Sequence, residues 1–238
     1  CTATSIGKKI LSQHVDGLVG ETDFIIKAHT DHGYFQNAIT EAIPTGFDDL
    51  PGISPRKRNE KQKLRVGFLG VLSHLKAPDL LATASHKLDA DRFHFSIAGK
   101  EQGINSAELK AQFAPNTAEL VGWVSPDDFL KTIDVLVLPS RGSEVFGRVI
   151  IEAYLRAVPV IGSNMGGIPE SIEHGKTGFV FENENVDQLV EQLQKLESDT
   201  KLYEQMSEKA LKKSADFSRE NWQTRTENFF QDVCKNSV

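Results

Sequence analysis

PSRGSEVFGRVIIEAYLRAVPVIGSNMGGIPE, residues 139–170, carries a strand end, a helix start and a second strand within one short stretch. The apolar run Val135–Leu138 just before it predicts a buried parallel strand, and Val158–Ile161 predicts the next strand. Gly147 marks the start of the helix between them. This pattern is typical of an open parallel α/β sheet. Such sheets bind ligands at the carboxyl ends of their strands, where residues 139–147 would lie.

Two carboxylates, Glu144 and Glu152, lie on either side of Gly147. A helix start presents unpaired backbone N–H groups and a partial positive charge, and a glycine there lets a pyrophosphate come close. Carboxylates are poor phosphate ligands but accept hydrogen bonds from the hydroxyl groups of a sugar or ribose. The layout therefore indicates a site for a phosphorylated sugar. The spacing alone is weak evidence, since Glu152 would also fit a solvated helix face or a pair with Arg148.

Strand and helix signals alternate from Leu64 onward. The predicted strands are Arg65–Leu69, Phe93–Ala98, Glu119–Val121, Val135–Leu138, Val158–Ile161 and Gly178–Phe181. Six strands separated by helices predict an α/β fold with a doubly wound parallel sheet of about six strands. Apolar stripes predict that two helices pack on this sheet, through Leu80, Ala84 and Leu88 and through Leu189, Val190, Leu193 and Leu196. Ser125 followed by Pro126 predicts a capped start for a further helix.

The motifs of residues 139–170 occur together in a known family. They are Pro139-Ser140, Glu144-x-Phe146-Gly147, Glu152-Ala153, Pro159-Val160, Gly166-Gly167 and Glu170. This set resembles the carboxyl-terminal signature of the retaining glycosyltransferases of family four, and LRVGFLGVLSHLKAPDLL upstream and HGKTGFVF downstream extend the resemblance. It implies the GT-B architecture, whose carboxyl-terminal domain is Rossmann-like. It also implies transfer of a sugar from a nucleoside-diphosphate sugar to an acceptor with retention of configuration, with no divalent metal and no other cofactor.

The resemblance gives roles to individual residues. Glu144 would hold sugar hydroxyls and Lys76 would neutralise the donor diphosphate, so these two are the implied catalytic residues. The implied donor-binding residues are Gly70, Gly99, Gly122, Trp123, Ser140, Phe146, Gly147, Arg148 and Glu152. Two of these assignments have simpler alternatives, because Lys76 would also fit a surface lysine and Trp123 a buried residue that packs the end of the sheet.

The chain departs from the family pattern beside Gly70. The family usually has an arginine directly after this glycine, whereas Val71 follows it here. The phosphate charge is then left to Lys76 and the helix start at Gly147, with Arg148 or His74 as further candidates. Val145 also stands where the family often has a glycine. These departures motivate a second hypothesis, a nucleotide-sugar-binding module without activity. A nicotinamide-dependent dehydrogenase is disfavoured, because the glycines of the first strand do not form Gly-x-Gly-x-x-Gly.

The resemblance also predicts how the chain is divided. Residues 1–50 would end the amino-terminal acceptor-binding domain, residues 51–63 would be a linker, and residues 64–218 would form the donor-binding domain. Residues 219–238 would form a helix that returns toward the amino-terminal domain. Because the chain begins at Cys1 without a methionine, inside a helical run, we expect a fragment that binds the donor but turns over little by itself.

Charge and composition narrow the partners. A net charge of −6 argues against nucleic acid as a partner, and the basic residues between Arg56 and Arg65 fit a solvated linker. Cys1 and Cys234 form neither a disulfide framework nor a metal motif, which favours the reducing cytoplasm. The longest apolar stretch, Val149–Ile161, is too short and too polar to span a bilayer, but attachment to a membrane face stays open. We expect a nucleotide-sugar donor and a carbohydrate or lipid-linked acceptor.

Overall fold

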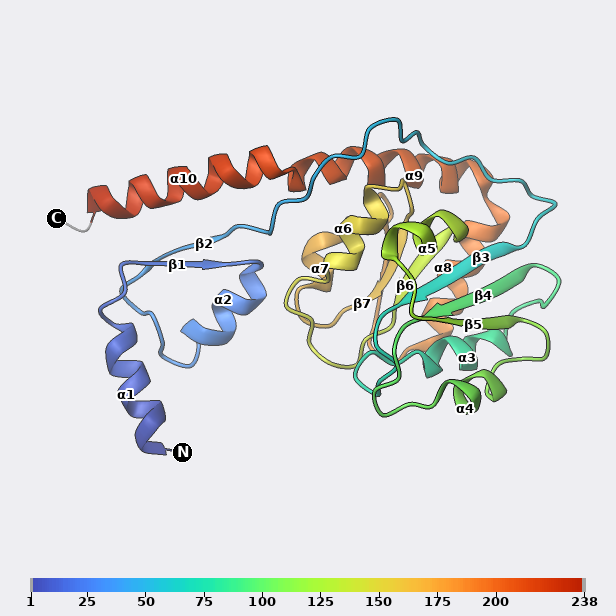
Figure 1. The fold of residues 1–238 in the computed structure, drawn as a ribbon, viewed down its shortest axis with the longest axis horizontal. Helices are drawn as coiled ribbons and strands as arrows, with labels where there is room; N and C mark the ends of the chain where they lie inside the picture. The colour runs from blue at the N-terminus through green and yellow to red at the C-terminus, as the bar shows by residue number, and fades with distance from the viewer. Residues whose placement is uncertain (1, 237–238) are drawn as a thin grey trace. The chain divides into compact units, whose positions relative to one another are not determined.

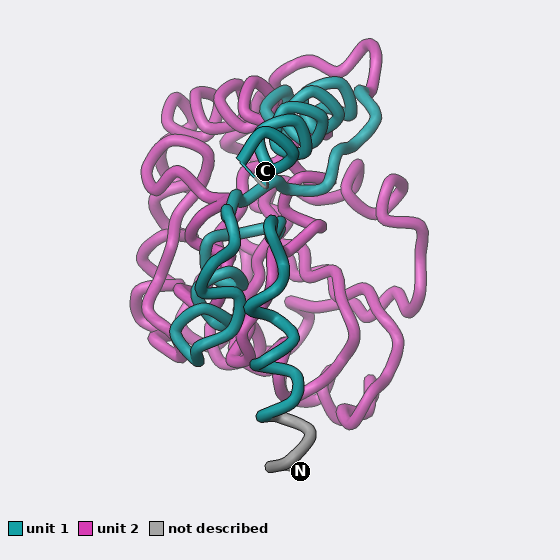
Figure 2. The backbone as a smooth tube through the Cα atoms, turned by 90° about the vertical axis from the view of Figure 1, so that its left-hand side faces the viewer, with its two compact units in different colours: residues 1–49, 215–238 teal, residues 50–214 magenta. Residues whose placement is uncertain are grey.

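A computed structural model describes residues 2–236 of the chain. They form two compact units (Figure 2). The larger unit contains Leu50–Ser214, and the smaller unit contains the residues up to Asp49 together with those from Ala215. Every candidate site residue therefore belongs to the larger unit.

The larger unit is built on one six-stranded sheet (Figure 1). Its strands are β3 (Leu64–Leu69), β4 (Phe93–Ala98), β5 (Ala118–Gly122), β6 (Val135–Leu138), β7 (Val160–Ser163) and β8 (Gly178–Phe181). They lie in the order β5-β4-β3-β6-β7-β8, and every neighbouring pair is parallel. The predicted doubly wound parallel sheet is confirmed. The apolar runs of β6 and β7 are buried along their whole length, as expected for strands covered on both faces.

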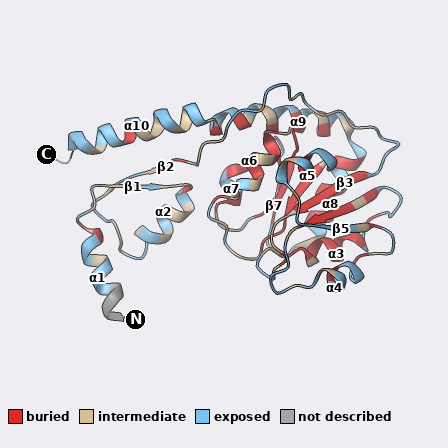
Figure 3. Cartoon of the chain, viewed as in Figure 1, coloured by how far each residue is buried: buried red, intermediate tan, exposed pale blue. Residues whose placement is uncertain are grey.

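Helices cover both faces of this sheet. They are α3 (Asp79–Ser85), α4 (Ser106–Ala111), α5 (Pro126–Thr132), α6 (Arg148–Tyr154), α7 (Ile168–Ser171), α8 (Val186–Ser198) and α9 (Thr200–Ser214). α3 packs against α4 and α8, whereas α6 packs against α5 and α9. The two predicted apolar stripes, one in and just after α3 and one in α8, are buried (Figure 3). All of their residues except Leu80 belong to one core cluster that also contains strand side chains.

Strand boundaries differ from the prediction mainly at β7, which begins at Val160 rather than Val158. Pro159 has no N–H group to donate, so it meets the sheet only through its carbonyl, which accepts from Leu136 N at 3.0 Å. The predicted helix start at Ser125 is correct in position. Its side chain, however, makes no capping hydrogen bond, and Pro126 at the first turn marks this start instead.

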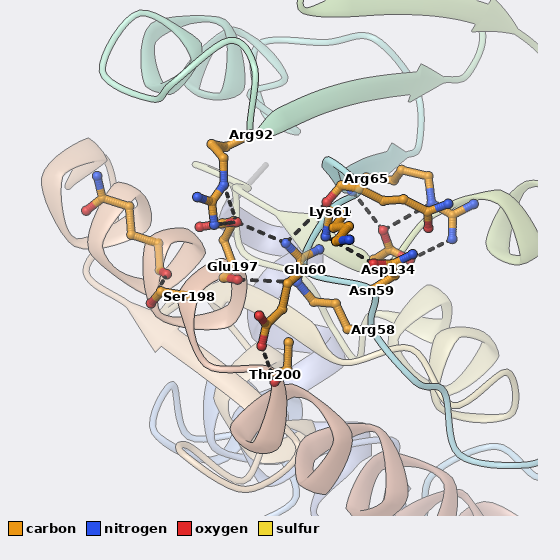
Figure 4. A network of polar contacts seen from close by, with 12 residues as sticks. Arg58, Asn59, Glu60, Lys61, Arg65, Arg92, Asp134, Glu197, Ser198 and Thr200 are labelled. Atoms are coloured by element: carbon orange, nitrogen blue, oxygen red, sulfur yellow. Dashed lines mark hydrogen bonds and ion pairs between the residues drawn. The ribbon is translucent and has the colours of Figure 1, made fainter.

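Two arginines anchor the segment between Gly52 and Lys63 within the larger unit, which corrects its interpretation as a solvated basic stretch at Arg56 and Arg58. The lysines of this segment are exposed. Arg56 donates from its guanidinium to the carbonyl oxygens of Leu130 (2.8 Å), Ile133 (2.5 Å) and Arg156 (2.9 Å). Arg58, whose side chain is 2% exposed, donates to the buried carboxylate of Glu197 at 3.1 Å (Figure 4). Burial lowers the pKa of Arg56, but the three carbonyl oxygens stabilise its charge.

The smaller unit contains a two-stranded parallel sheet and a long terminal helix. Its elements are α1 (Thr2–Ser12), β1 (Gly17–Gly20), α2 (Asp23–Thr30), β2 (Ile39–Ala42), the short 3-10 helix η1 (Ala215–Phe217) and α10 (Arg219–Asn236). Thr22 caps α2 as predicted, because its hydroxyl accepts from Ile25 N. Arg225 of α10 donates to Glu41 at 2.8 Å and to the Ala42 carbonyl at 2.7 Å, which holds α10 on β2.

Cys234, near the end of α10, is an exposed free thiol, whereas Cys1 lies outside the described residues. Across residues 2–236 the helices are too short or too polar to cross a lipid bilayer.

Candidate functional site

The direction in which the sheet grows reverses at β3. The chain passes from β3 outward to β4 and β5, and then returns to place β6 on the other side of β3. The connections that follow β3 and β6 therefore lead away from each other at the carboxyl end of the sheet, the position at which open parallel sheets commonly bind ligands. Two segments lie at this end, residues 70–78 after β3 and residues 139–147 after β6, and they carry the predicted Lys76 and Glu144.

Lys76 and Glu144 meet at this point, although 68 positions separate them in the sequence. The Lys76 ammonium donates to Oε1 of Glu144, and Ser140 Oγ donates to the same oxygen at 2.8 Å. The Ser140 carbonyl in turn accepts from Ser163 Oγ of β7 at 2.7 Å. Ser140 is buried, so its hydroxyl binds Glu144 from the protein interior. Glu144 keeps 16% of its side chain exposed, whereas Lys76 keeps 36%.

The backbone of Glu144 is held by two glycines that follow β7. Gly167 N donates to the Glu144 carbonyl at 2.7 Å. Gly166 has φ +62° and lies so close that a Cβ atom there would stand 2.1 Å from the same carbonyl oxygen. Only glycine tolerates both the left-handed conformation and this contact. The Gly166-Gly167 pair therefore fixes where Glu144 stands.

Gly147 begins α6 in the left-handed conformation, with φ 78° and ψ 57°. Its carbonyl accepts from Ile150 N at 2.8 Å. The Phe146 side chain is buried and the Arg148 side chain is exposed. A ligand at the start of α6 would thus meet backbone at Phe146 and Gly147, and a cation at Arg148.

Three predicted donor-binding residues line one hollow of about 370 Å³ at the same end of the sheet. Gly70, Gly99 and Trp123 form its wall together with Val71 and other neighbours. Trp123 is 71% exposed, so the alternative of a buried packing residue is wrong. The Lys100 ammonium lies 5.6 Å from the centre of the Trp123 ring, within range of a cation–π contact.

An uncharged residue, Val71, occupies the position after Gly70, where the family usually has an arginine. Val71 lines the hollow, and Leu72 is 2% exposed. Leu72 N donates to the Lys100 carbonyl at 2.8 Å, and the Leu72 carbonyl accepts from two further amides. The segment continues the pairing of β3 with β4 here, and no lysine or arginine precedes Lys76 in it. Gly122 acts through its backbone as well, since its carbonyl accepts from Gly99 N at 2.8 Å.

Glu152 lines a second hollow of about 260 Å³, together with Ser125, Asp127 and Arg156. Burial raises the pKa of the Glu152 carboxyl, and the charge of Arg148 one turn earlier lowers it by less. A fully solvated helix face is therefore excluded for this residue. Asp127 forms an ion pair with Arg156 beside it. The two hollows share Pro126 as a common wall.

The structure groups the predicted residues into two clusters joined by α6. Lys76, Ser140 and Glu144 are in contact, whereas Glu152 shares a wall with the hollow of Gly70, Gly99 and Trp123. Glu144 lies outside both hollows, so one cavity does not hold the two glutamates. Gly147 stands between them in the sequence, one residue before the first turn of α6.

Sequence reasoning missed several residues of this region. Arg141 binds Asp79 and Glu184, and Lys100 covers Trp123. Asp127 pairs with Arg156 beside Glu152. These partners lie far apart along the chain, so no local spacing could reveal them. Within residues 2–236, no group of three or more His, Cys, Asp and Glu side chains has the arrangement of a metal site.

Comparisons with known proteins agree with this geometry. The chain is 32% identical over 166 residues to an uncharacterized 42.6 kDa protein in the cps region of Klebsiella pneumoniae, covering 70% of this chain and 43% of that protein. It is 30% identical over 193 residues to the D-inositol 3-phosphate glycosyltransferase of Mycobacterium marinum, covering 72% of this chain and 41% of that enzyme. The chain thus spans about half the length of these curated relatives.

A solved structure has the same fold. Anabaena HepE in complex with UDP and glucose matches with a TM-score of 0.78 at 18% identity, covering 97% of this chain and 67% of that chain. The family model described as "Glycosyl transferases group 1" matches residues 52–213, which is more than half of the chain and includes every candidate site residue. The expected family is therefore confirmed: this chain belongs to the glycosyl transferases of group 1.

Proposed function

We propose that this chain binds a nucleoside-diphosphate sugar at the carboxyl end of its sheet and serves in transferring the sugar to an acceptor with retention of configuration. The observation that carries the proposal is the meeting of Lys76 and Glu144 at the point where the sheet reverses its order. The Lys76 ammonium can bind a phosphate oxygen, and the Glu144 carboxylate beside it can accept hydrogen bonds from sugar hydroxyl groups. The pair therefore suits the junction between a diphosphate and a sugar.

The proposed chemistry is mainly electrostatic. As the bond between the sugar C1 and the diphosphate oxygen breaks, its electron pair moves onto the diphosphate, and the acceptor oxygen bonds C1 on the same face. The acceptor proton passes to the departing diphosphate. Lys76 and the backbone at Gly147 would stabilise the growing negative charge, while Glu144 would hold the sugar hydroxyls. No metal or other cofactor enters this scheme.

The two hollows support a place for the rest of the donor. Trp123 presents an exposed aromatic face beside Gly70 and Gly99, which suits a nucleobase. Glu152 lines the adjoining hollow, where a carboxylate could accept from ribose hydroxyls. UDP is bound by HepE, which shares the fold, so UDP is the first nucleotide to test.

Isothermal titration calorimetry with UDP, GDP, ADP and CDP tests the binding step. We expect one of them to bind the wild type, and Lys76→Ala to weaken that binding about 10- to 100-fold, because a charged hydrogen bond to phosphate is lost. Lys87→Ala is the matched control, since Lys87 also pairs with a carboxylate, Asp187, at the end of α3. Equal binding by wild type and Lys76→Ala would refute the assignment of Lys76.

A binding module without activity is the second candidate, favoured by the apolar Val71 and Leu72 beside Gly70. Transfer is proposed for the whole protein, because the chain spans about half the length of its curated relatives. An assay of the whole protein with the nucleotide sugar that binds, read by NMR at the anomeric carbon, separates the candidates. Retention of configuration supports the transferase, whereas binding without any turnover, hydrolysis included, supports the module. The acceptor is proposed to be a carbohydrate or a lipid-linked sugar at the cytoplasmic face of a membrane.

A further inference from the structure

Arg141 lies directly after Ser140, and its guanidinium is shared by three neighbouring loops. Nη1 and Nη2 donate to the two carboxylate oxygens of Asp79 at 2.8 and 2.6 Å. Nε donates to Oε1 of Glu184 at 2.6 Å, and Nη1 also approaches the His74 carbonyl at 3.4 Å. The loops that follow β3, β6 and β8 thus meet at one planar cation, whose rigid fork suits two-point binding of a carboxylate.

The backbone around Arg141 makes a second connection to the same loop. Arg141 N and Gly142 N both donate to the Leu75 carbonyl, at 2.8 and 3.0 Å. Leu75 immediately precedes Lys76, so these two hydrogen bonds hold the backbone next to the lysine. Beyond Lys76, the grip of Arg141 on Asp79 fixes the start of α3. Lys76 therefore lies on a short span that is held at Leu75 by the backbone amides of Arg141 and Gly142 and at Asp79 by the Arg141 side chain.

Arg141 has no spare capacity for a phosphate. Two carboxylates neutralise it, and its side chain is only 26% exposed. Burial acts to raise the pKa of Asp79, but the hydrogen bonds from Arg141 outweigh burial and hold that pKa below its ordinary value. Asp79 is thus ionised at neutral pH and keeps its grip on Arg141. The effect of Arg141 on the site must then be one of position.

We propose that Arg141 is a positioning residue that holds the Lys76 ammonium against Glu144 by joining the loop after β3 to the loop after β6. In the absence of ligand this sets the contact between the two side chains. In the donor complex, the same positioning by Arg141 places the lysine beside the diphosphate. This second consequence rests on the proposed function. The charge of Arg141 would not suffice for this role, because a lysine cannot span both oxygens of Asp79 together with Glu184.

The first experiment needs no ligand. The intact chain is labelled with trace acetic anhydride, and the rate at each lysine is read by mass spectrometry. An amine held in an ion pair reacts slowly, so we expect Arg141→Gln and Arg141→Lys to raise the Lys76 rate about twofold to fivefold relative to wild type. Glu144→Gln, which removes the ion-pair partner itself, should raise it as well. Lys87, paired with Asp187, is the internal reference and should not change.

Arg65→Gln is the matched control. Arg65 binds Asp134 through Nε at 3.0 Å and Nη2 at 2.6 Å, so it has similar chemistry, but it lies at the amino end of β3 (Figure 4). Its loss should leave the Lys76 rate as in wild type. A Lys76 rate unchanged in Arg141→Gln while Glu144→Gln raises it would overturn the proposal, and so would full rescue by Arg141→Lys. Should Arg141→Gln fail to fold, Asp79→Asn removes the same grip and must give the same increase.

The second experiment is a double-mutant cycle with UDP and GDP as the calorimetric probes. For a probe that binds, Arg141→Gln should weaken binding about tenfold, and adding Lys76→Ala should weaken it little further, because both changes remove the same contact. Additive losses would contradict a shared role. If neither probe binds wild type although labelling changes as expected, the proposed function has failed for these nucleotides, while the positioning by Arg141 stands.

Discussion

Gly166 is a single residue on which the position of Glu144 depends. Gly166→Ala would put a methyl group 2.1 Å from the Glu144 carbonyl oxygen in a left-handed conformation. We expect the free energy of unfolding to fall by about 3 kcal/mol, since overpacking and backbone strain add. Gly175→Ala is the control, because Gly175 has φ +75° with open space around it and should cost only about 1 kcal/mol. Urea denaturation measures both, and equal losses would contradict the close approach at Gly166.

Glu152 should make stability depend on pH. Burial raises its folded pKa above the ordinary value of 4.5, so the carboxyl contributes fully to stability below about pH 4 and loses that contribution as the pH rises through its folded pKa. Removing the negative charge of Glu152 should therefore increase the stability of the fold only at higher pH. We expect Glu152→Gln to melt at a higher temperature than wild type at pH 8, with the gap closing toward pH 4. A lower melting temperature for Glu152→Gln at pH 8 would contradict the burial of this carboxylate.

The residues that make up the candidate site could be predicted to different degrees. Lys76 and Glu144 follow strands that the apolar pattern reveals. The sequence therefore predicts that both lie at the carboxyl end of the sheet. Arg141 was not, because its partners Asp79 and Glu184 lie 62 and 43 positions away and only the fold brings them together. The exposure of Trp123 was likewise left open, since an aromatic residue suits both a core and a ligand surface.

At the scale of elements, apolar runs predicted the strands well and the connections poorly. Most strands of the larger unit are short and largely buried, so their side chains carry the signal. β5 has no buried residue, and backbone pairing sets its ends, whereas a proline shifts the start of β7. The stretch before β3 was judged by its basic composition to be solvated. Three carbonyl groups around Arg56, which no sequence pattern shows, reverse that interpretation for this residue.

Arg56 should therefore contribute strongly to holding the segment before β3 in place. We expect Arg56→Ala to lower the free energy of unfolding by about 2–4 kcal/mol, because three carbonyl groups lose their charged donor. Lys57→Ala, a change at the exposed neighbouring residue, should stay within about 0.5 kcal/mol of wild type. The two variants are compared by urea denaturation. A mobile, unattached segment would make them indistinguishable.

At the scale of the whole molecule, all candidate site residues belong to the unit Leu50–Ser214, which has its own sheet and core. We expect residues 50–214, expressed alone, to fold cooperatively and to bind the preferred nucleotide within about twofold of the full chain, because a domain with its own core can fold independently. Circular dichroism melting and calorimetry check this. A truncated chain that folds but no longer binds would show that the site needs residues of the smaller unit.

The most direct test of the central claim is a crystal structure of the chain with the nucleoside diphosphate that calorimetry selects. We predict that the terminal phosphate accepts a hydrogen bond from Lys76 Nζ beside the start of α6, with the base on Trp123. A nucleotide bound elsewhere, with Lys76 still paired to Glu144 and untouched by phosphate, would contradict the account.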